Sequence, residues 1–251
     1  MHSVLISLVV FGCTFGGALF GMFLHSILPK EHLQPGTTDV VKLATGLVVT
    51  MTGLVLGMLV SSSLTFYNTQ HREIQDLSAK LILTDRILSE YGPETREIRS
   101  NLHDVVAIAA NRIWPEDRSL RTDLKPDHTF ANVYGELQAL PPKNEQQRTN
   151  RAEALGLMRA IYETRWLMFV ESSGNAFSTP LLTILVSWLT VIFISFGLLA
   201  QRNATLTGTL IVCSLAVSAA VFIIVEMYDP FEGLFRMSAT PMRSVLEQIG
   251  R

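Results

Sequence analysis

Two neighbouring stretches, TILVSWLTVIFISFGLLA at residues 183–200 and LTGTLIVCSLAVSAAVFIIV at residues 206–225, decide the fold. Neither contains a charged residue, and the short loop Gln201-Arg202-Asn203-Ala204 lies between them. A helix of roughly 18 or more apolar residues is long enough to be read as a membrane span, because it approaches the ~30 Å thickness of the hydrocarbon core. One small domain could not bury such runs, so we expect both to be transmembrane helices.

Two further apolar runs lie near the N-terminus. Residues 4–28 contain no charge, and as a helix they would be about 37 Å long, enough to cross a bilayer with some tilt. A cleaved signal peptide fits poorly, because no Lys or Arg precedes this run and no A-x-A site follows it. Residues 40–67 form the other run, which only Lys42 interrupts. The sequence therefore predicts four transmembrane helices.

The composition of the chain agrees with a membrane protein. Charged residues make up 17% of its 251 positions, against about 25% in soluble domains, and the net charge is −2. This balance gives no reason to expect nucleic acid as a partner. Cys13 and Cys213 both lie within apolar runs and lack metal-ligand spacing, so we expect neither a disulfide framework nor a zinc site.

The basic residues predict the orientation in the membrane. With four spans, both termini lie on the same side as the central polar segment. Five basic residues lie close to predicted membrane ends on that side: Arg72, Lys80, Arg165, Arg236 and Arg243. The opposite side carries Lys30, Lys42 and Arg202. Because Lys and Arg favour the cytoplasmic side, we expect the central domain and both termini to be cytoplasmic.

The central polar segment reads as a series of helices. A stripe of apolar residues at helical spacing begins it: Ile74, Leu77, Leu81 and Leu88, with Glu73 lying off this stripe. The first helix continues from the second span and stops at Tyr91-Gly92-Pro93-Glu94, where a second helix starts. That helix runs to about Ile113, and further helices cover residues 130–139 and 144–171. The expected fold is all-α, with no strand.

These elements define four expected parts of the chain. Residues 1–67 hold the first two spans, and residues 68–178 form a cytoplasmic helical bundle inserted between spans 2 and 3. Residues 179–228 hold the last two spans, and residues 229–251 form a cytoplasmic tail.

Catalytic arrangements are absent from the sequence. There is no phosphate-binding glycine loop, G-x-S-x-G, H-E-x-x-H or C-x-x-C, and the six histidines are scattered without paired spacing. We therefore expect no catalytic residues, no resident metal and no cofactor.

The second span carries a polar stripe that could line a pore. At 100° per residue, seven positions share one face of this helix: Lys42, Thr45, Val49, Thr52, Leu56, Val60 and Ser63. In a ring of such helices Lys42 would attract anions at the outer mouth, and Val49 or Leu56 would form an apolar constriction. Gly53-x-x-x-Gly57 flanks the stripe and allows close helix approach. The alternative is that the hydroxyls bond back to helix carbonyls and the glycines only pack.

The exit of the fourth span holds three carboxylates around a Pro-Phe turn. The residues called here the post-span motif are Glu226, Asp229, Pro230, Phe231 and Gly233. Glu232, which lies between Phe231 and Gly233, is the third carboxylate. Pro230 stops the helix, and Phe231 is expected to anchor at the membrane interface. The acids could contribute to a Ca²⁺ site, which takes about six to eight oxygens. Since three acids fall short of that number, pairing with Arg236 and Arg243 is the preferred interpretation.

Motifs in three regions resemble those of the bacterial bestrophin-like domain family. They are Leu28-Pro29-Lys30-Glu31-His32-Leu33 with Asp39-Val40-Val41-Lys42-Leu43, then Asp85-Arg86-Ile87-Leu88 with Tyr91-Gly92-Pro93-Glu94, and finally Asp229-Pro230-Phe231-Glu232-Gly233-Leu234-Phe235-Arg236-Met237-Ser238 with Pro241-Met242-Arg243. The resemblance covers nearly the whole chain.

A more distant resemblance links this family to the bestrophins, which are pentameric anion channels with four spans per subunit and a pore lined by the second span. The resemblance implies a homo-oligomer in a bacterial inner membrane, with inorganic ions and the lipid bilayer as partners. Two departures stand out. The acidic run that completes a calcium clasp in bestrophins is reduced here to Glu232, and a pore neck rich in Phe and Ile is replaced by Val49, Leu56 and Val60.

Two functions are therefore open. The first is a bestrophin-like homo-oligomeric ion channel, anion-conducting if the resemblance holds, with the second span lining the pore. The alternative is a membrane-anchored scaffold or sensor whose cytoplasmic helices bind a protein partner through an exposed Ile74 to Leu88 stripe.

Overall fold

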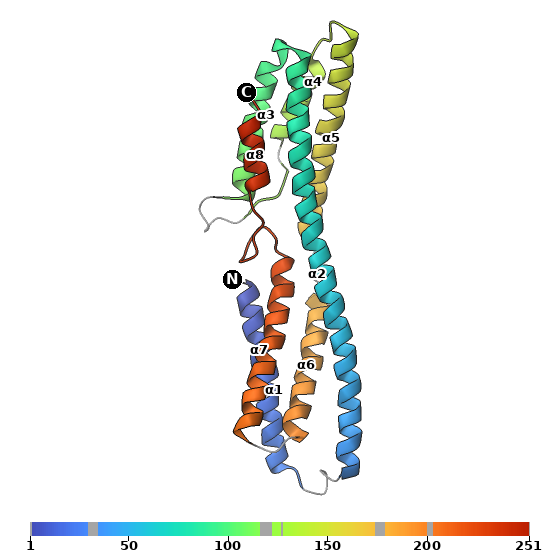
Figure 1. The fold of residues 1–251 in the computed structure, drawn as a ribbon, viewed down its shortest axis with the longest axis vertical. Coiled ribbons are helices and arrows are strands. Elements are labelled where there is room, and N and C mark those ends of the chain that lie inside the picture. The colour runs from blue at the N-terminus through green and yellow to red at the C-terminus, as the bar shows by residue number, and fades with distance from the viewer. Residues whose placement is uncertain are drawn as a thin grey trace. The chain divides into compact units, whose positions relative to one another are not determined.

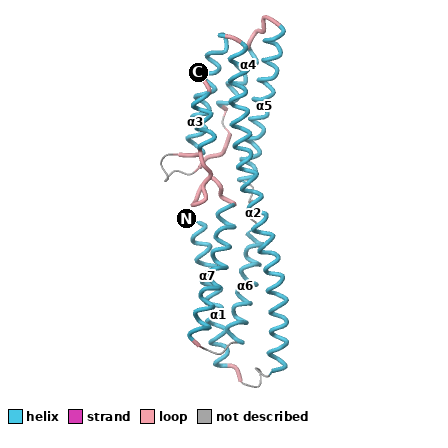
Figure 2. Tube along the Cα trace, viewed as in Figure 1, coloured by secondary structure: helices cyan, strands magenta, loops and turns pink. Residues whose placement is uncertain are grey.

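A computed structural model describes residues 2–29, 35–115, 122–126, 128–173, 179–199 and 203–250. Within these ranges the chain is helical and contains no strand, which confirms the all-α prediction (Figure 2). The elements in chain order are α1 (His2–Ile27), α2 (Pro35–Tyr91), the short 3₁₀ helix η2 (Pro93–Thr95), α3 (Arg96–Ile113), α4 (Thr129–Ala139), α5 (Glu145–Ser173), α6 (Thr179–Leu199), α7 (Ala204–Met227) and α8 (Thr240–Gln248) (Figure 1).

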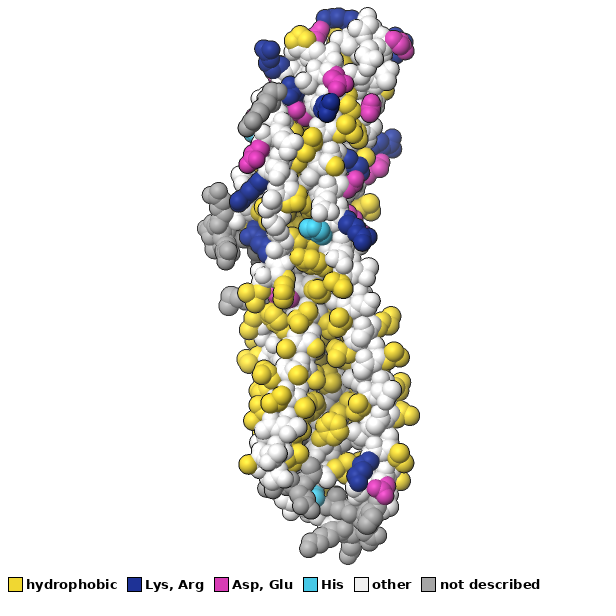
Figure 3. Space-filling model, viewed as in Figure 1, with side chains coloured by type: hydrophobic (Ala, Val, Ile, Leu, Met, Phe, Trp, Pro, Cys, Tyr) yellow, Lys and Arg dark blue, Asp and Glu magenta, His cyan; other side chains and the backbone are white. Residues whose placement is uncertain are grey.

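The chain divides into two compact units. The first, called here the apolar unit, comprises Met1–Phe66 and Phe177–Tyr228, and the second, the polar unit, comprises Tyr67–Ala176 and Asp229–Arg251. Helix α2 belongs to both, because the division falls within it. Figure 3 shows hydrophobic side chains covering the apolar unit, whereas Lys, Arg, Asp and Glu are spread over the polar unit.

Four helices are long and apolar enough to cross a membrane, as the sequence predicts. They are α1, α2, α6 and α7, and the apolar part of each has a mean hydropathy of 2.1 to 2.5. These helices expose many Leu, Val, Ile and Phe side chains, which would be unfavourable in water. In a bilayer, lipid acyl chains solvate the same surface. Such a unit is built to lie in a bilayer.

Small residues hold the apolar unit together where α1 crosses α6. A Cβ added to Gly21 would overlap backbone atoms of Ile194, and one added to Gly197 would overlap the carbonyl of Ala18. Two backbones can approach this closely only where side chains are absent, which is how helices associate without a hydrophobic driving force. Figure 1 shows α1 running alongside α6 and α7. Between α1 and α7, Ser218 Oγ also donates to the carbonyl of Ser7 at 2.5 Å.

The polar unit has one hydrophobic core, built by the C-terminal part of α2 with α3, α4, α5 and α8. The predicted stripe is its centre, since Ile74, Leu77, Leu81 and Leu88 are all buried. Helix α2 ends at Tyr91, as the Gly92-Pro93 sequence predicts, and Gly92 has a φ of 136° that favours glycine. Thr95 closes this turn by donating its hydroxyl to the carbonyl of Leu88 at 2.5 Å.

A buried ion pair adds a polar contact to this core. The guanidinium of Arg99 donates two hydrogen bonds of 2.8 Å to the carboxylate of Asp85, which raises the pKa of Arg99. The backbone N–H of Gly250 also donates to Asp85 Oδ1 at 3.1 Å. Asp85 thereby joins α2, α3 and the end of the chain, and such fork-shaped pairing fixes geometry as well as adding energy.

We predict that Gly21→Ala destabilises the protein, whereas Gly12→Ala does not. The new methyl group at position 21 overlaps backbone that cannot rotate away, a clash expected to lower the free energy of unfolding by about 1–3 kcal/mol. A Cβ at Gly12 meets no atom within 4 Å, and alanine favours the helix there by up to about 1 kcal/mol. Thermal unfolding of both variants in detergent measures the difference, and equal effects would contradict the close α1–α6 contact.

Candidate functional site

The seven residues predicted to line a pore occupy one edge of α2 and differ in exposure. Thr45, Thr52 and Ser63 are buried within the apolar unit, and Leu56 is half-buried. Lys42, Val49 and Val60 are exposed, with Val49 at 39% and Val60 at 38%. The stripe therefore straddles the boundary between the face of α2 that packs against its own subunit and the face left uncovered. Pore lining remains a prediction for all seven.

The buried hydroxyls of this stripe bond to their own helix. Thr52 Oγ1 donates to the carbonyl of Val48 at 2.7 Å, and Ser63 Oγ donates to that of Val60 at 2.9 Å. These are the bonds that the alternative reading of the stripe expects, because they satisfy a hydroxyl without an external partner. For Thr52 and Ser63, the hydroxyl groups therefore need neither ion nor water.

A hollow of about 590 Å³ brings three of the predicted residues together. Lys42, Thr45 and Val49 of α2 line it with side chains of α6 and α7, which are Phe196, Leu199, Leu206, Thr209, Leu210 and Cys213. The lining is mostly apolar, and among the described residues that form it the ammonium group of Lys42 is the one side-chain cation. Lys42 lies 3.4 Å from Asp39, and both side chains are more than half exposed, so this ion pair is weak. Asp39 therefore neutralises the ammonium group of Lys42 only weakly.

The remaining face of α2 is uncovered by its own subunit. Leu43, Leu54 and Met58 are 76%, 77% and 74% exposed, and a Cβ added to Gly53 or Gly57 would meet no atom within 4 Å. In the most apolar window of α2 only 11% of residues are buried, against 28% to 33% in the other three candidate spans. Helix α2 is therefore the candidate span whose surface its own subunit covers least.

The turn after α7 is anchored in the polar unit. Phe231 is buried, and its ring packs edge-on against that of Trp114, with 6.1 Å between the two ring centres. The N–H of Met237 donates to the carbonyl of Pro230 at 2.8 Å. The expectation that Phe231 anchors at a membrane interface is therefore wrong, because the protein core supplies its apolar surroundings. Gly233 has a φ of 81°, a backbone conformation suited to glycine.

The carboxylates of the post-span motif are not gathered at one point. Glu226 is buried near the end of α7 in the apolar unit, whereas Asp229 is exposed and Glu232 accepts the backbone N–H of Thr122 at 3.1 Å in the polar unit. Across the described ranges, no group of three His, Cys, Asp or Glu residues could hold a metal ion.

Among the described residues, no ion pair joins Arg236 or Arg243 to an acid of the post-span motif. The Nε and Nη2 atoms of Arg236 are buried and have no hydrogen-bond partner in the part of the chain that the structure describes. Glu232, the nearest acid in the sequence, is directed to Thr122 instead.

The bestrophin-like domain family matches residues 12–242, which include most of α1, all of α2 to α7 and the start of α8. The chain belongs to the bestrophin-like domain family. The match confirms the resemblance found in the sequence motifs. Neither a characterised protein nor a solved structure matches the chain.

Sequence reasoning missed a buried acidic cluster in this bestrophin-like protein. Gln70 is fully buried, and its Nε2 donates to Glu171 Oε2 at 2.8 Å, joining α2 to α5. Glu73, which the sequence places off the buried stripe, is half-buried, and its Oε2 has no hydrogen-bond partner among the described residues. Burial first, and then the charges of Glu171 and Asp76, raise the pKa of Glu73 to about 7. The one available signal was Gln70, a polar residue four positions before Ile74 in the apolar stripe.

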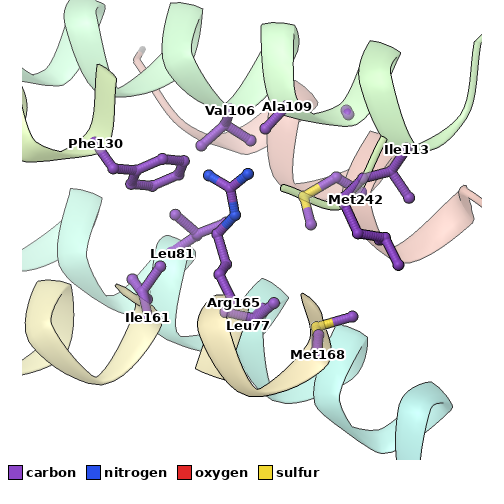
Figure 4. A pocket seen from close by; sticks show the side chains of 12 residues that line it. Leu77, Leu81, Val106, Ala109, Ile113, Phe130, Ile161, Arg165, Met168 and Met242 are labelled. Atoms are coloured by element: carbon purple, nitrogen blue, oxygen red, sulfur yellow. The ribbon is translucent and has the colours of Figure 1, made fainter. Parts of the chain in front are cut away.

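A buried arginine was also missed. Arg165 was counted as a basic residue near a membrane end, but it is only 8% exposed, and its guanidinium lies 4.7 Å from the ring centre of Phe130. Figure 4 shows this guanidinium between Phe130, Val106 and Leu81, in a cavity of about 30 Å³ with a mostly apolar lining. A cavity of that size holds about one water molecule. Arg165 therefore helps to organise the core of the polar unit.

We predict that Glu73→Gln makes stability less sensitive to pH. Because folding raises the pKa of Glu73 from 4.5 to about 7, the folded state binds this proton more tightly than the unfolded state. The stabilisation is complete below about pH 4.5 and is lost as pH rises through about 7. The variant should therefore unfold at a higher temperature than the wild type at about pH 8.

The matched control for this prediction is Glu153→Gln, an exposed position on α5. Thermal unfolding between about pH 4.5 and about pH 8 compares the two variants with the wild type. Parallel curves for Glu73→Gln and the wild type would contradict the burial of a protonated Glu73.

Proposed function

We propose that this bestrophin-like protein is a homo-oligomeric channel that conducts anions, with α2 of each subunit lining a central pore. Membership of the family supports channel activity in general, and the bestrophins supply the expectation of a pentamer. The proposal places the subunits in a bacterial inner membrane. Both termini and residues 68–178 would lie in the cytoplasm, as the distribution of Lys and Arg favours.

The observation that carries the proposal is the uncovered surface of α2. A helix that its own subunit buries so little has most of its surface available to other copies, and Gly53 and Gly57 allow their backbones to approach. A ring formed in this way places α2 around an axis. Among the seven stripe residues, Lys42, Val49 and Val60 are those that the subunit leaves free to face ions.

The chemistry of this edge favours anions. A ring of Lys42 ammonium groups attracts negative charge at one mouth, and rings of Val49 and Val60 form apolar constrictions that close by dewetting. Leu56, half-buried between them, adds to the constriction. Thr45, Thr52 and Ser63 would lie behind the pore surface, against helices of their own subunit.

The scaffold or sensor alternative expected a protein partner to bind the Ile74 to Leu88 stripe, but this stripe is buried. Ile74, Leu77, Leu81 and Leu88 are each no more than 3% exposed and form the core of the polar unit. A partner could not reach this stripe without unfolding the unit. A scaffold function would therefore need another surface.

We predict that the purified oligomer, reconstituted into liposomes, carries a chloride flux and that Lys42→Glu lowers its preference for anions over cations severalfold. Reversal of the charge ring replaces attraction by repulsion at the mouth of the pore. Lys125→Glu makes the same charge change in the polar unit and serves as the control. An intact oligomer that passes no ions would defeat the proposal, and equal effects of the two variants would remove Lys42 from the pore.

A further inference from the structure

A second charged cavity lies in the polar unit, apart from α2. It has a volume of about 310 Å³, and its lining is mostly polar. The residues that matter for its chemistry are Trp114, Arg236, Ser238, Thr240 and Arg243. Three of these belong to the motifs that carry the family resemblance, and the proposed channel uses none of the five.

Two arginines, Arg236 and Arg243, line this cavity. Arg236 is half-buried, and its Nε and Nη2 atoms are buried without a hydrogen-bond partner, whereas Arg243 is exposed. No carboxylate is found among the described residues that line the cavity. A buried donor without a hydrogen-bond partner is unfavourable, and more so if it is charged. Among the described residues, the lining of the cavity therefore carries two positive charges and no negative one.

The backbone around Arg236 is held firmly. The indole N–H of Trp114 donates to the carbonyl of Met237 at 3.0 Å, and the N–H of Met237 donates to the carbonyl of Pro230 at 2.8 Å. These two bonds fix the backbone of the residue next to Arg236, so less of the cavity wall has to be ordered when a ligand binds.

Hydroxyl groups and a helix start complete the lining. Ser238 Oγ and Thr240 Oγ1 lie 2.6 Å apart, and the N–H of Thr240 donates to Ser238 Oγ at 3.2 Å. Helix α8 begins at Thr240, so the positive end of its dipole adds to the charge of both arginines. Because one hydroxyl donates to the other, one hydroxyl hydrogen remains for a ligand.

We infer that this cavity binds a phosphate group through Arg236 and Arg243. The planar guanidinium presents paired N–H donors that match two oxygens of a tetrahedral oxyanion, which a single chloride ion cannot use. The cavity is larger than a phosphate ion, so it has room for the remainder of a phosphorylated molecule. The phosphate could be free in solution or part of a lipid headgroup, and the two sources share this recognition chemistry.

Binding to the full-length protein in a neutral detergent tests the inference. Inorganic phosphate and short-chain phosphatidylglycerol are titrated in separate arms, with sodium chloride at matched ionic strength as the reference, and thermal unfolding is the readout. Saturable stabilisation by phosphate identifies a soluble ligand, and saturable stabilisation by phosphatidylglycerol alone identifies a lipid headgroup. Stabilisation by neither, or an equal effect of chloride, overturns the inference.

Variants assign the effect to the cavity. Arg236→Gln and Arg243→Gln should each weaken binding by at least about tenfold, since each removes a charged hydrogen-bond donor. Arg148→Gln, an exposed arginine of α5, is the matched control and should leave affinity unchanged. Without ligand, Arg236→Gln should unfold no earlier than the wild type, because the substitution removes buried guanidinium donors that have no partner among the described residues. If Arg148→Gln weakens binding as much as the cavity variants do, the assignment fails.

Discussion

An apolar helix surface that its own chain leaves uncovered must meet either lipid or another protein, and this constraint governs the apolar unit. Without water, backbone hydrogen bonds must be satisfied within each helix, so the long uncharged runs have no alternative to the helical state. Their lateral association then depends on shape. Helices α1 and α6 achieve it through Gly21 and Gly197, where the absence of side chains lets the two backbones touch.

The same constraint separates α2 from the other three spans. Its surface is the least covered, and its exposed face combines large apolar residues such as Leu54 and Met58 with the glycines at positions 53 and 57. Leucine and methionine are equally suited to lipid and to a protein neighbour, but glycines offer lipid no advantage and offer another helix a close contact. In the proposed assembly this face packs against other copies of the chain. The conducting edge is then the narrow band containing Lys42, Val49 and Val60.

Much of the fold follows from local patterns in the sequence. The length of the uncharged runs predicts the spans, and apolar residues at a period of 3.6 predict the buried stripe from Ile74 to Leu88. Gly92 and Pro93 predict where α2 ends. The candidate site follows less well, because helical periodicity defines a face but not which neighbour covers it. The seven predicted residues therefore include both covered and uncovered positions of α2, because the packing of α6 and α7 decides which positions are covered. The surroundings of Phe231, Arg165 and Glu73 could not be predicted for a related reason. Each owes its environment to a residue far away in the chain, namely Trp114, Phe130 and Glu171.

The central claim is that the free face of α2 meets other copies of the chain around an axis. The most direct test is an electron cryo-microscopy image of the purified protein in a lipid nanodisc. The account predicts a closed ring in which α2 from each subunit is the innermost helix and a continuous hole runs along the axis. A single subunit surrounded by lipid, or an assembly in which α2 faces outward, would contradict it.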